Sequence, residues 1–146
     1  MKPKPAMIML ADDDPDDRLL IKEAFEENRL LNPLYTVEDG EKLMNYLQRR
    51  EGFENALRPS LILLDLNMPR KSGFEALREI KADPELRRIP VVILTTSKAE
   101  EDIVRSYDLG VNSFIVKPVS FESLVALVKE LDRYWFQIVE LPNGEN

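Results

Sequence analysis

Five short, mainly apolar runs limit the fold of this chain more than any other feature of its sequence. They alternate with longer amphipathic stretches, and they occupy residues 7–11, 34–38, 61–65, 89–96 and 113–117. Strands that are apolar throughout are buried on both faces, which is typical of a parallel sheet between two layers of helices. The pattern therefore predicts five β-α units and a doubly wound α/β domain.

Helix start and stop signals lie between these runs. Asp14 is placed to cap a helix, and Asp16 and Asp17 follow where the positive end of the helix dipole favours acids. Ser120 is a second candidate cap, and Gly110 lies where a left-handed residue would close a helix. We expect helices at residues 15–29, 40–50, 73–81, 99–109 and 120–136.

The amino-acid composition removes several classes of chemistry. The chain of 146 residues is long enough for one domain with its own core, and it contains neither cysteine nor histidine. There is therefore no disulfide, no thiolate or imidazole metal site and no histidine-dependent catalytic triad. The formal charge of −7 argues against nucleic acid as a main partner, and the first residues fit neither a signal peptide nor a membrane span. We expect a cytoplasmic protein without membrane contacts.

The residues that end the apolar runs are polar and of few kinds. Asp12 and Asp13 follow the first run, Asp65 ends the third, Thr95 lies near the end of the fourth and Lys117 ends the fifth. The carboxyl ends of parallel strands meet at one edge of the sheet, where open α/β sheets bind their ligands. We therefore expect three carboxylates, a hydroxyl and an ammonium group to converge on one site.

Helix capping does not account for Asp12 and Asp13, because both precede the expected cap at Asp14. Three neighbouring carboxylates would repel by about 4 kcal/mol per close pair at an effective dielectric constant of about 20, so a cation should lie among them. Oxygen ligands with room for water and phosphate favour Mg²⁺ over zinc. Thr95 and Phe114 taken alone would be ordinary strand residues, and only their register with the other strand ends indicates a role.

With these residues in place, the sequence resembles the receiver domain of two-component response regulators over nearly its whole length. The resemblance is carried by Gly73 and by the segments "MLADDD", "LLDLNMP", "VVILTTS" and "FIVKP". It implies a flavodoxin-like receiver fold, in which a five-stranded parallel sheet has the strand order 2-1-3-4-5.

The resemblance also implies a role for each residue at a strand end. Asp65 would accept a phosphoryl group from a phosphohistidine of a sensor histidine kinase, which agrees with the absence of histidine from this chain. Asp13, Asp65 and the backbone carbonyl of Asn67 would bind Mg²⁺ directly, and Asp12 mainly through a metal-bound water. Lys117 would pair with Asp65 and then with the phosphoryl oxygens. Such a protein catalyses only its own phosphorylation and dephosphorylation.

A conformational switch is implied at two further positions. The hydroxyl of Thr95 would bond a phosphoryl oxygen, and Phe114, at the family's switch-aromatic position, would rotate into the vacated space. A downstream protein that the sequence does not identify would read this change. The peptide bond between Lys117 and Pro118 is expected to be cis, as the family's fold implies.

The C-terminal segment adds an apolar extension to the expected receiver domain. We divide the chain into a receiver domain at residues 1–132 and an extension at residues 133–146, with no output domain. The stretch "YWFQIVELP" resembles that of single-domain regulators paired with phytochrome kinases, whose extension helps to form homodimers. An apolar helix end needs a covering surface. The residues expected at a homodimer contact are Tyr134, Trp135, Phe136, Ile138 and Val139.

Other functions use the same architecture. An aspartyl-phosphate phosphatase needs a second aspartate two residues after the nucleophile, where this chain has Asn67. The five glycines lie too far apart for a GxGxxG or phosphate-binding loop, which argues against a nucleotide- or flavin-binding protein. The intact set of Asp, Thr and Lys residues argues against a receiver that signals without phosphate. A phosphorelay intermediate and a phosphate sink stay open as alternatives to an output regulator.

Overall fold

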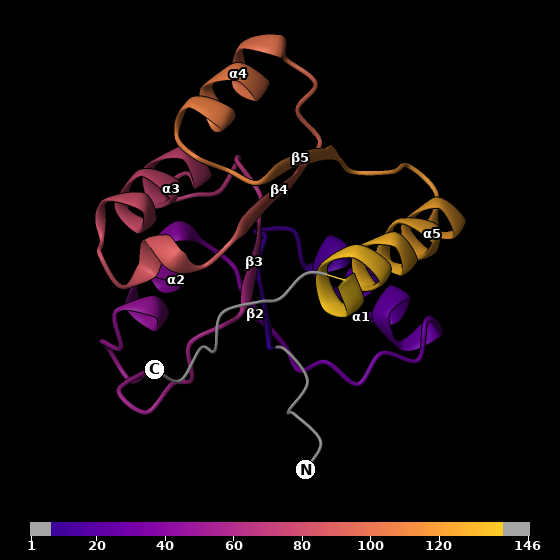
Figure 1. Ribbon diagram of the computed structural model, residues 1–146, viewed down its shortest axis with the longest axis horizontal. Helices are drawn as coiled ribbons and strands as arrows, with labels where there is room; N and C mark the ends of the chain where they lie inside the picture. Colours follow the sequence, from indigo (N-terminus) through magenta and orange to yellow (C-terminus); the bar gives the residue numbers. More distant parts are fainter. Residues whose placement is uncertain (1–6, 139–146) are drawn as a thin grey trace.

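The computed structural model describes the backbone of residues 7–138 and the side chains of residues 7–135. Strands and helices alternate along this part of the chain (Figure 1). The strands are β1 (Ile8–Ala11), β2 (Leu34–Val37), β3 (Leu61–Leu64), β4 (Val91–Thr95) and β5 (Ser113–Val116). The α-helices are α1 (Pro15–Glu27), α2 (Gly40–Leu47), α3 (Gly73–Ala82), α4 (Glu100–Asp108) and α5 (Phe121–Leu131). A 3-10 helix, η1 (Leu86–Arg88), precedes β4, and a π-helix, η2 (Asp132–Ile138), follows α5.

The five strands form one parallel sheet in the order β2-β1-β3-β4-β5. In its centre, Leu10 of β1 lies opposite Thr36 of β2 on one side and Leu63 of β3 on the other. The predicted doubly wound fold and its strand order are both confirmed. The order of connection reverses between β1 and β3, and in open α/β sheets the ligand crevice lies at such a reversal.

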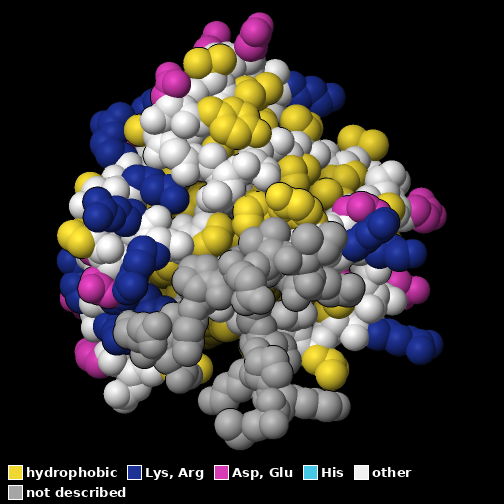
Figure 2. Space-filling model, in the orientation of Figure 1, with side chains coloured by type: hydrophobic (Ala, Val, Ile, Leu, Met, Phe, Trp, Pro, Cys, Tyr) yellow, Lys and Arg dark blue, Asp and Glu magenta, His cyan; other side chains and the backbone are white. Residues whose placement is uncertain are grey.

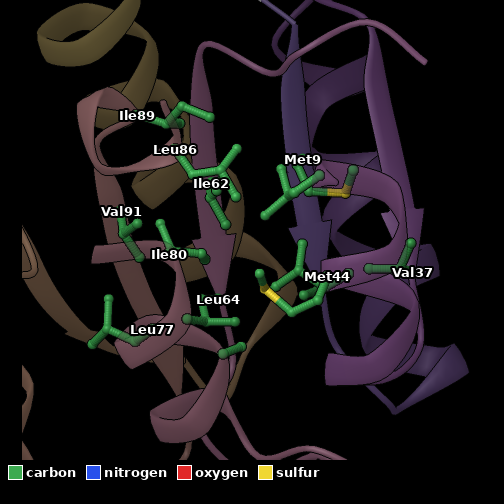
Figure 3. Close-up of a cluster of buried hydrophobic side chains, with 14 of the residues drawn as sticks. Met9, Val37, Met44, Ile62, Leu64, Leu77, Ile80, Leu86, Ile89 and Val91 are labelled. Carbon is green, nitrogen blue, oxygen red and sulfur yellow. The ribbon is translucent and has the colours of Figure 1, made fainter. Parts of the chain in front are cut away.

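Two layers of helices cover the sheet, with α1 and α5 on one face and α2 and α3 on the other (Figure 1). Successive strand residues point to opposite faces, so each central strand contributes to two cores. The core under α2 and α3 includes Met9, Met44, Ile62, Leu64 and Leu77 (Figure 3). The core under α1 and α5 includes Ile8, Leu10, Ile21, Leu63 and Val128. Burial of β1, β3 and β4 along their whole length explains their continuous apolar runs.

Side-chain caps begin α1 and α5 where the sequence predicts. Asp14 accepts hydrogen bonds from the backbone N–H groups of Asp16 and Asp17, and Ser120 accepts one from the first turn of α5. Gly110 follows α4 with a φ of 99°, a left-handed conformation that glycine adopts at no steric cost. The predicted caps at Asp14 and Ser120 and the left-handed Gly110 are confirmed.

Gly73 allows α3 to begin directly against the end of β3. A Cβ atom at this position would lie 2.2 Å from the backbone oxygen of Asp65 and 2.7 Å from the Cα atom of Leu66. The N–H group of Gly73 donates to the carbonyl oxygen of Leu66 at 2.9 Å. Any side chain would push α3 away from the strand end, so glycine here helps to fix the backbone around Asp65.

The helical backbone continues from α5 into η2 without a break at residue 132. Trp135 is buried on the core under α1 and α5, and its ring meets the exposed ring of Tyr134 edge-on. The burial of Trp135 ties the start of the extension to its own domain. Within residues 7–138, no helix has the length and apolar character needed to cross a membrane.

Candidate functional site

Three carboxylates meet at the carboxyl edge of the sheet. Asp12 and Asp65 come directly after the last residues of β1 and β3, and both side chains are buried. Asp13 is exposed beside them. One oxygen from each of these residues lies within 4.8 Å of the other two. We call Asp12, Asp13 and Asp65 the acidic cluster.

Lys117 follows β5 and places its ammonium group against the acidic cluster. The Nζ atom lies 2.6 Å from Oδ2 of Asp12 and 2.9 Å from Oδ2 of Asp65. A further carboxylate, that of Asp17 in the first turn of α1, lies 2.9 Å from the same nitrogen. An ammonium group has three N–H donors, so these contacts can use all of them.

Burial and ion pairing shift the pKa values of these groups in opposite directions. Burial raises the pKa of the Asp12 carboxyl above its ordinary value, and the hydrogen bonds from Lys117 and from the N–H of Asp14 offset only part of that effect. Burial alone would lower the pKa of Lys117, but its hydrogen bonds to Asp12, Asp17 and Asp65 raise it above its ordinary value. Lys117 is therefore a permanent cation at neutral pH and compensates the buried carboxylates.

Further hydrogen bonds fix the orientation of the acidic cluster. The N–H of Asp14 donates to Oδ1 of Asp12 at 3.0 Å, and the guanidinium of Arg18 donates to the backbone oxygen of Asp12 at 2.7 Å. The N–H of Asn67 donates to Oδ1 of Asp65 at 3.2 Å. The start of α1 and the turn after β3 thus hold the carboxylates in place before any ligand binds.

Thr95 and Phe114 lie on the last two strands of the sheet. The buried hydroxyl of Thr95 donates to Oδ1 of Asp65 at 2.8 Å. Phe114 is half-buried on β5, and its N–H donates to the hydroxyl of Tyr107 in α4 at 3.2 Å. The register of β4 and β5 pairs Thr95 with Val116, two residues beyond Phe114, so Thr95 and Phe114 point to the same face of the sheet.

The structure therefore brings Asp12, Asp13, Asp65, Thr95 and Lys117 to one site, as their positions at the strand ends predict. The prediction that Asp17 serves only the helix dipole is incomplete, because its side chain also contacts Lys117. The sequence carries no signal for this contact, because the contact depends on how α1 is rotated against the sheet and on the rotamer of Asp17.

The peptide bond between Lys117 and Pro118 is trans, since no cis bond occurs in residues 7–138. The expectation of a cis bond is therefore wrong for this structure. The trans form is the lower-energy isomer before proline, and from this backbone the ammonium of Lys117 reaches its carboxylate partners.

The residues expected at a homodimer contact do not share one environment. Tyr134 is exposed, whereas Trp135 is buried in the core of its own domain. The side chains of Phe136 and Ile138, and the whole of Val139, lie outside the described residues.

The acidic cluster has the donor set of a hard divalent cation. It offers carboxylate oxygens alone, and Asp13 keeps one side open to solvent. Lys117 compensates part of the negative charge, and a divalent cation would compensate the remainder. These residues can therefore hold a divalent metal ion.

Known proteins share both the sequence and the fold of this chain. The response regulator receiver domain model matches residues 8–129. Response regulator Rcp1 of Synechocystis sp. is 41% identical over 138 residues, which are 94% of each chain. The structure of the phosphorylated cyanobacterial phytochrome response regulator RcpA has a TM-score of 0.90 at 45% identity, over 95% of this chain and 99% of that one. The Mn²⁺-bound form of Rcp1 has a TM-score of 0.88 at 41% identity, over 94% of this chain and 99% of that one.

Replacing Asp13 by asparagine should raise the melting temperature of the metal-free protein by a few degrees at most. The variant loses one charge from the acidic cluster, and exposure to solvent screens that charge. Thermal melts in EDTA and in Mg²⁺ measure the effect, and Mg²⁺ should stabilise the parent far more than the variant. Asp16→Asn, which removes a charge outside the cluster, should respond to Mg²⁺ like the parent. A variant that melts below the parent in EDTA would show that repulsion between the carboxylates does not destabilise the metal-free protein.

Proposed function

This chain belongs to the response regulator receiver domain family, and we propose that it accepts a phosphoryl group on Asp65 and signals through the resulting change of conformation. The observation that carries the proposal is the environment of the Asp65 carboxylate. It is buried at the end of β3, 2.9 Å from the ammonium of Lys117 and 2.8 Å from the hydroxyl of Thr95. Catalysis of phosphoryl transfer rests on positioning and on stabilising charge, and these neighbours supply both.

In the proposed reaction, an oxygen of Asp65 attacks the phosphorus of a phosphohistidine on a sensor histidine kinase. The new P–O bond forms while the P–N bond breaks, and the electron pair leaves with the imidazole nitrogen. Lys117 is placed to stabilise the charge that spreads over the phosphoryl oxygens. The chain contains no histidine, so the donor imidazole belongs to a partner. Attack of water on the phosphorus later releases phosphate, and the protein thus acts only on itself.

Mg²⁺ is the ion that we propose for the acidic cluster. Its ligands are hard oxygens, and Mg²⁺ is the usual partner of phosphate groups in such sites. The relative Rcp1 has been solved in a Mn²⁺-bound form, which supports a divalent ion here. Asp13, Asp65 and the backbone carbonyl of Asn67 would hold the ion, and Asp12 would contact it through water. When bound, the ion supplies positive charge for the phosphoryl oxygens.

Thr95 and Phe114 are the proposed readout of phosphorylation. Thr95 would exchange its hydrogen bond to Asp65 for one to a phosphoryl oxygen, and Phe114, on the same face of the sheet, would move into the vacated space. β5 is only half-buried along its length, and hydrophobic side chains gather on this side of the molecule between α4 and α5 (Figure 2). This surface is where a downstream protein would detect the change.

A phytochrome-type histidine kinase is the proposed donor, because the similar protein RcpA is a cyanobacterial phytochrome response regulator. An open hollow of about 260 Å³ lies beside Lys117, and the exposed apolar residues Leu20, Val119 and Phe121 line it. The part of the kinase that carries the phosphohistidine would contact these residues as it approaches Asp65. Because such kinases draw their phosphate from ATP, we place the protein in the cytoplasm.

Phosphotransfer from a panel of purified, ³²P-labelled histidine kinases tests this function. The parent should take up label in Mg²⁺ from acetyl phosphate and, most rapidly within the panel, from a phytochrome-type kinase. Asp65→Asn should take up label from neither source, because it lacks the nucleophilic carboxylate. Full labelling of Asp65→Asn would overturn the assignment of the acceptor. Equal rates of phosphotransfer from all kinases would overturn only the proposed pairing with a phytochrome-type kinase.

Dimerisation is the function that we propose for the extension at residues 133–146, which follows the receiver domain at residues 1–132. The helical backbone carries the chain beyond α5 as far as Ile138. Trp135 anchors this segment on its own core, and the exposed ring of Tyr134 is left for a second copy of the chain.

Light scattering of the full chain and of a chain that ends at Asp132 tests the dimer. The full chain should be dimeric and the shorter chain monomeric. Because truncation also removes the buried Trp135, a Tyr134→Glu variant of the full chain probes the contact without opening the core. A dimer that survives both changes would exclude the extension from the interface.

A further inference from the structure

Asp17 contacts Lys117 as closely as the proposed acceptor does. Its Oδ2 atom lies 2.9 Å from Nζ, the same distance as Oδ2 of Asp65. The side chain of Asp17 is 30% exposed, whereas that of Lys117 is 9% exposed. Asp17 lies outside the acidic cluster, whose oxygens come from Asp12, Asp13 and Asp65. Its contact therefore needs an explanation other than metal binding.

The three partners of Lys117 differ in what happens to them during phosphorylation. Asp12 and Asp65 belong to the acidic cluster, so a divalent cation there would share their charge and repel the ammonium group. Asp65 would also be converted from a free carboxylate into an acyl phosphate. Asp17 alone of the three would keep its full charge, because it belongs neither to the acidic cluster nor to the residue that is phosphorylated.

We propose that Asp17 is a positioning residue that holds the ammonium of Lys117 at the site while metal and phosphoryl group engage Asp12 and Asp65. This inference rests on the proposed phosphorylation of Asp65. One N–H of Lys117 stays bonded to Asp17, and the other two can follow the negative charge from the carboxylates to the phosphoryl oxygens. Without this anchor, the long lysine side chain would disperse over many rotamers once the metal binds.

The first turn of α1 gives Asp17 a fixed position from which to act. The N–H of Asp17 donates to Oδ1 of Asp14 at 3.4 Å, within the helix cap. Ile21, one turn later on the same side of α1, is buried in the core under α1 and α5. Arg18 ties the same turn to the backbone oxygen of Asp12. The helix backbone and the core, and not a flexible loop, thus set the place of the Asp17 carboxylate.

The rate of phosphorylation by acetyl phosphate at saturating Mg²⁺ tests this role. Asp17→Asn should slow labelling by about tenfold, since small misplacements of a catalytic group have effects of this order or larger. Asp17→Glu should restore part of the rate. Asp16→Asn is the matched control, because it removes the same charge from the same turn at an exposed position and should keep the parent rate. An Asp17→Asn rate equal to or above that of the parent would overturn the proposal.

A double-mutant cycle tests whether Asp17 acts through Lys117. In a Lys117→Ala background, Asp17→Asn should cause no further loss of the residual rate, and another tenfold loss would refute action through Lys117. If Lys117→Ala does not fold, the labelling rates of Asp17→Asn and Asp17→Glu still test the proposal, because the variant with a carboxylate at position 17 should be the faster of the two. A parent that takes up no label would defeat the proposed function itself. A labelled parent with equal rates for Asp17→Asn and Asp16→Asn would defeat only the positioning role.

Discussion

The ammonium of Lys117 lies among three carboxylates, and two of them, Asp12 and Asp65, are buried. A buried ion without a partner costs several kcal/mol, so neither carboxylate would be tolerable at the end of an apolar strand without this cation. The same hydrogen bonds raise the pKa of Lys117, although burial alone would lower it. The site is thus an ion network in which Lys117 compensates part of the charge of the carboxylates. A metal ion or a phosphoryl group at these carboxylates would have to exchange with the hydrogen bonds that Lys117 makes to Asp12 and Asp65.

The fold supplies the rigidity that such an exchange requires. Thr95 ends a buried strand, and Asp12 and Asp65 directly follow buried strands, so backbone hydrogen bonds of the sheet set the positions of these residues. Gly73 brings α3 against the backbone of Asp65, where a Cβ atom would not fit. Because Thr95 donates to Asp65 from β4, and Phe114 faces the same side from β5, a change at Asp65 has a short route to the half-buried edge of the sheet.

The strand ends could be predicted from the sequence because a parallel sheet forces them to one edge, whatever the details of packing. The contact of Asp17 with Lys117 could not be predicted from the sequence, since it depends on how α1 is rotated and on which rotamer the Asp17 side chain adopts. The burial of Trp135 posed a similar difficulty, because an apolar residue in an extension can cover its own core or a partner equally well. The cis bond before Pro118 came from family resemblance alone, with no residue pattern to support it, and the structure has it trans.

Chemical identification of the phosphorylated residue tests the central claim most directly. Borohydride reduces an aspartyl phosphate to homoserine, which mass spectrometry can locate within a peptide. After incubation with acetyl phosphate and Mg²⁺, we expect homoserine in place of Asp65 and at no other aspartate. Homoserine in place of Asp12, Asp13 or Asp17, or an unmodified chain that nevertheless binds Mg²⁺, would contradict the role of Asp65 as the nucleophile of this site.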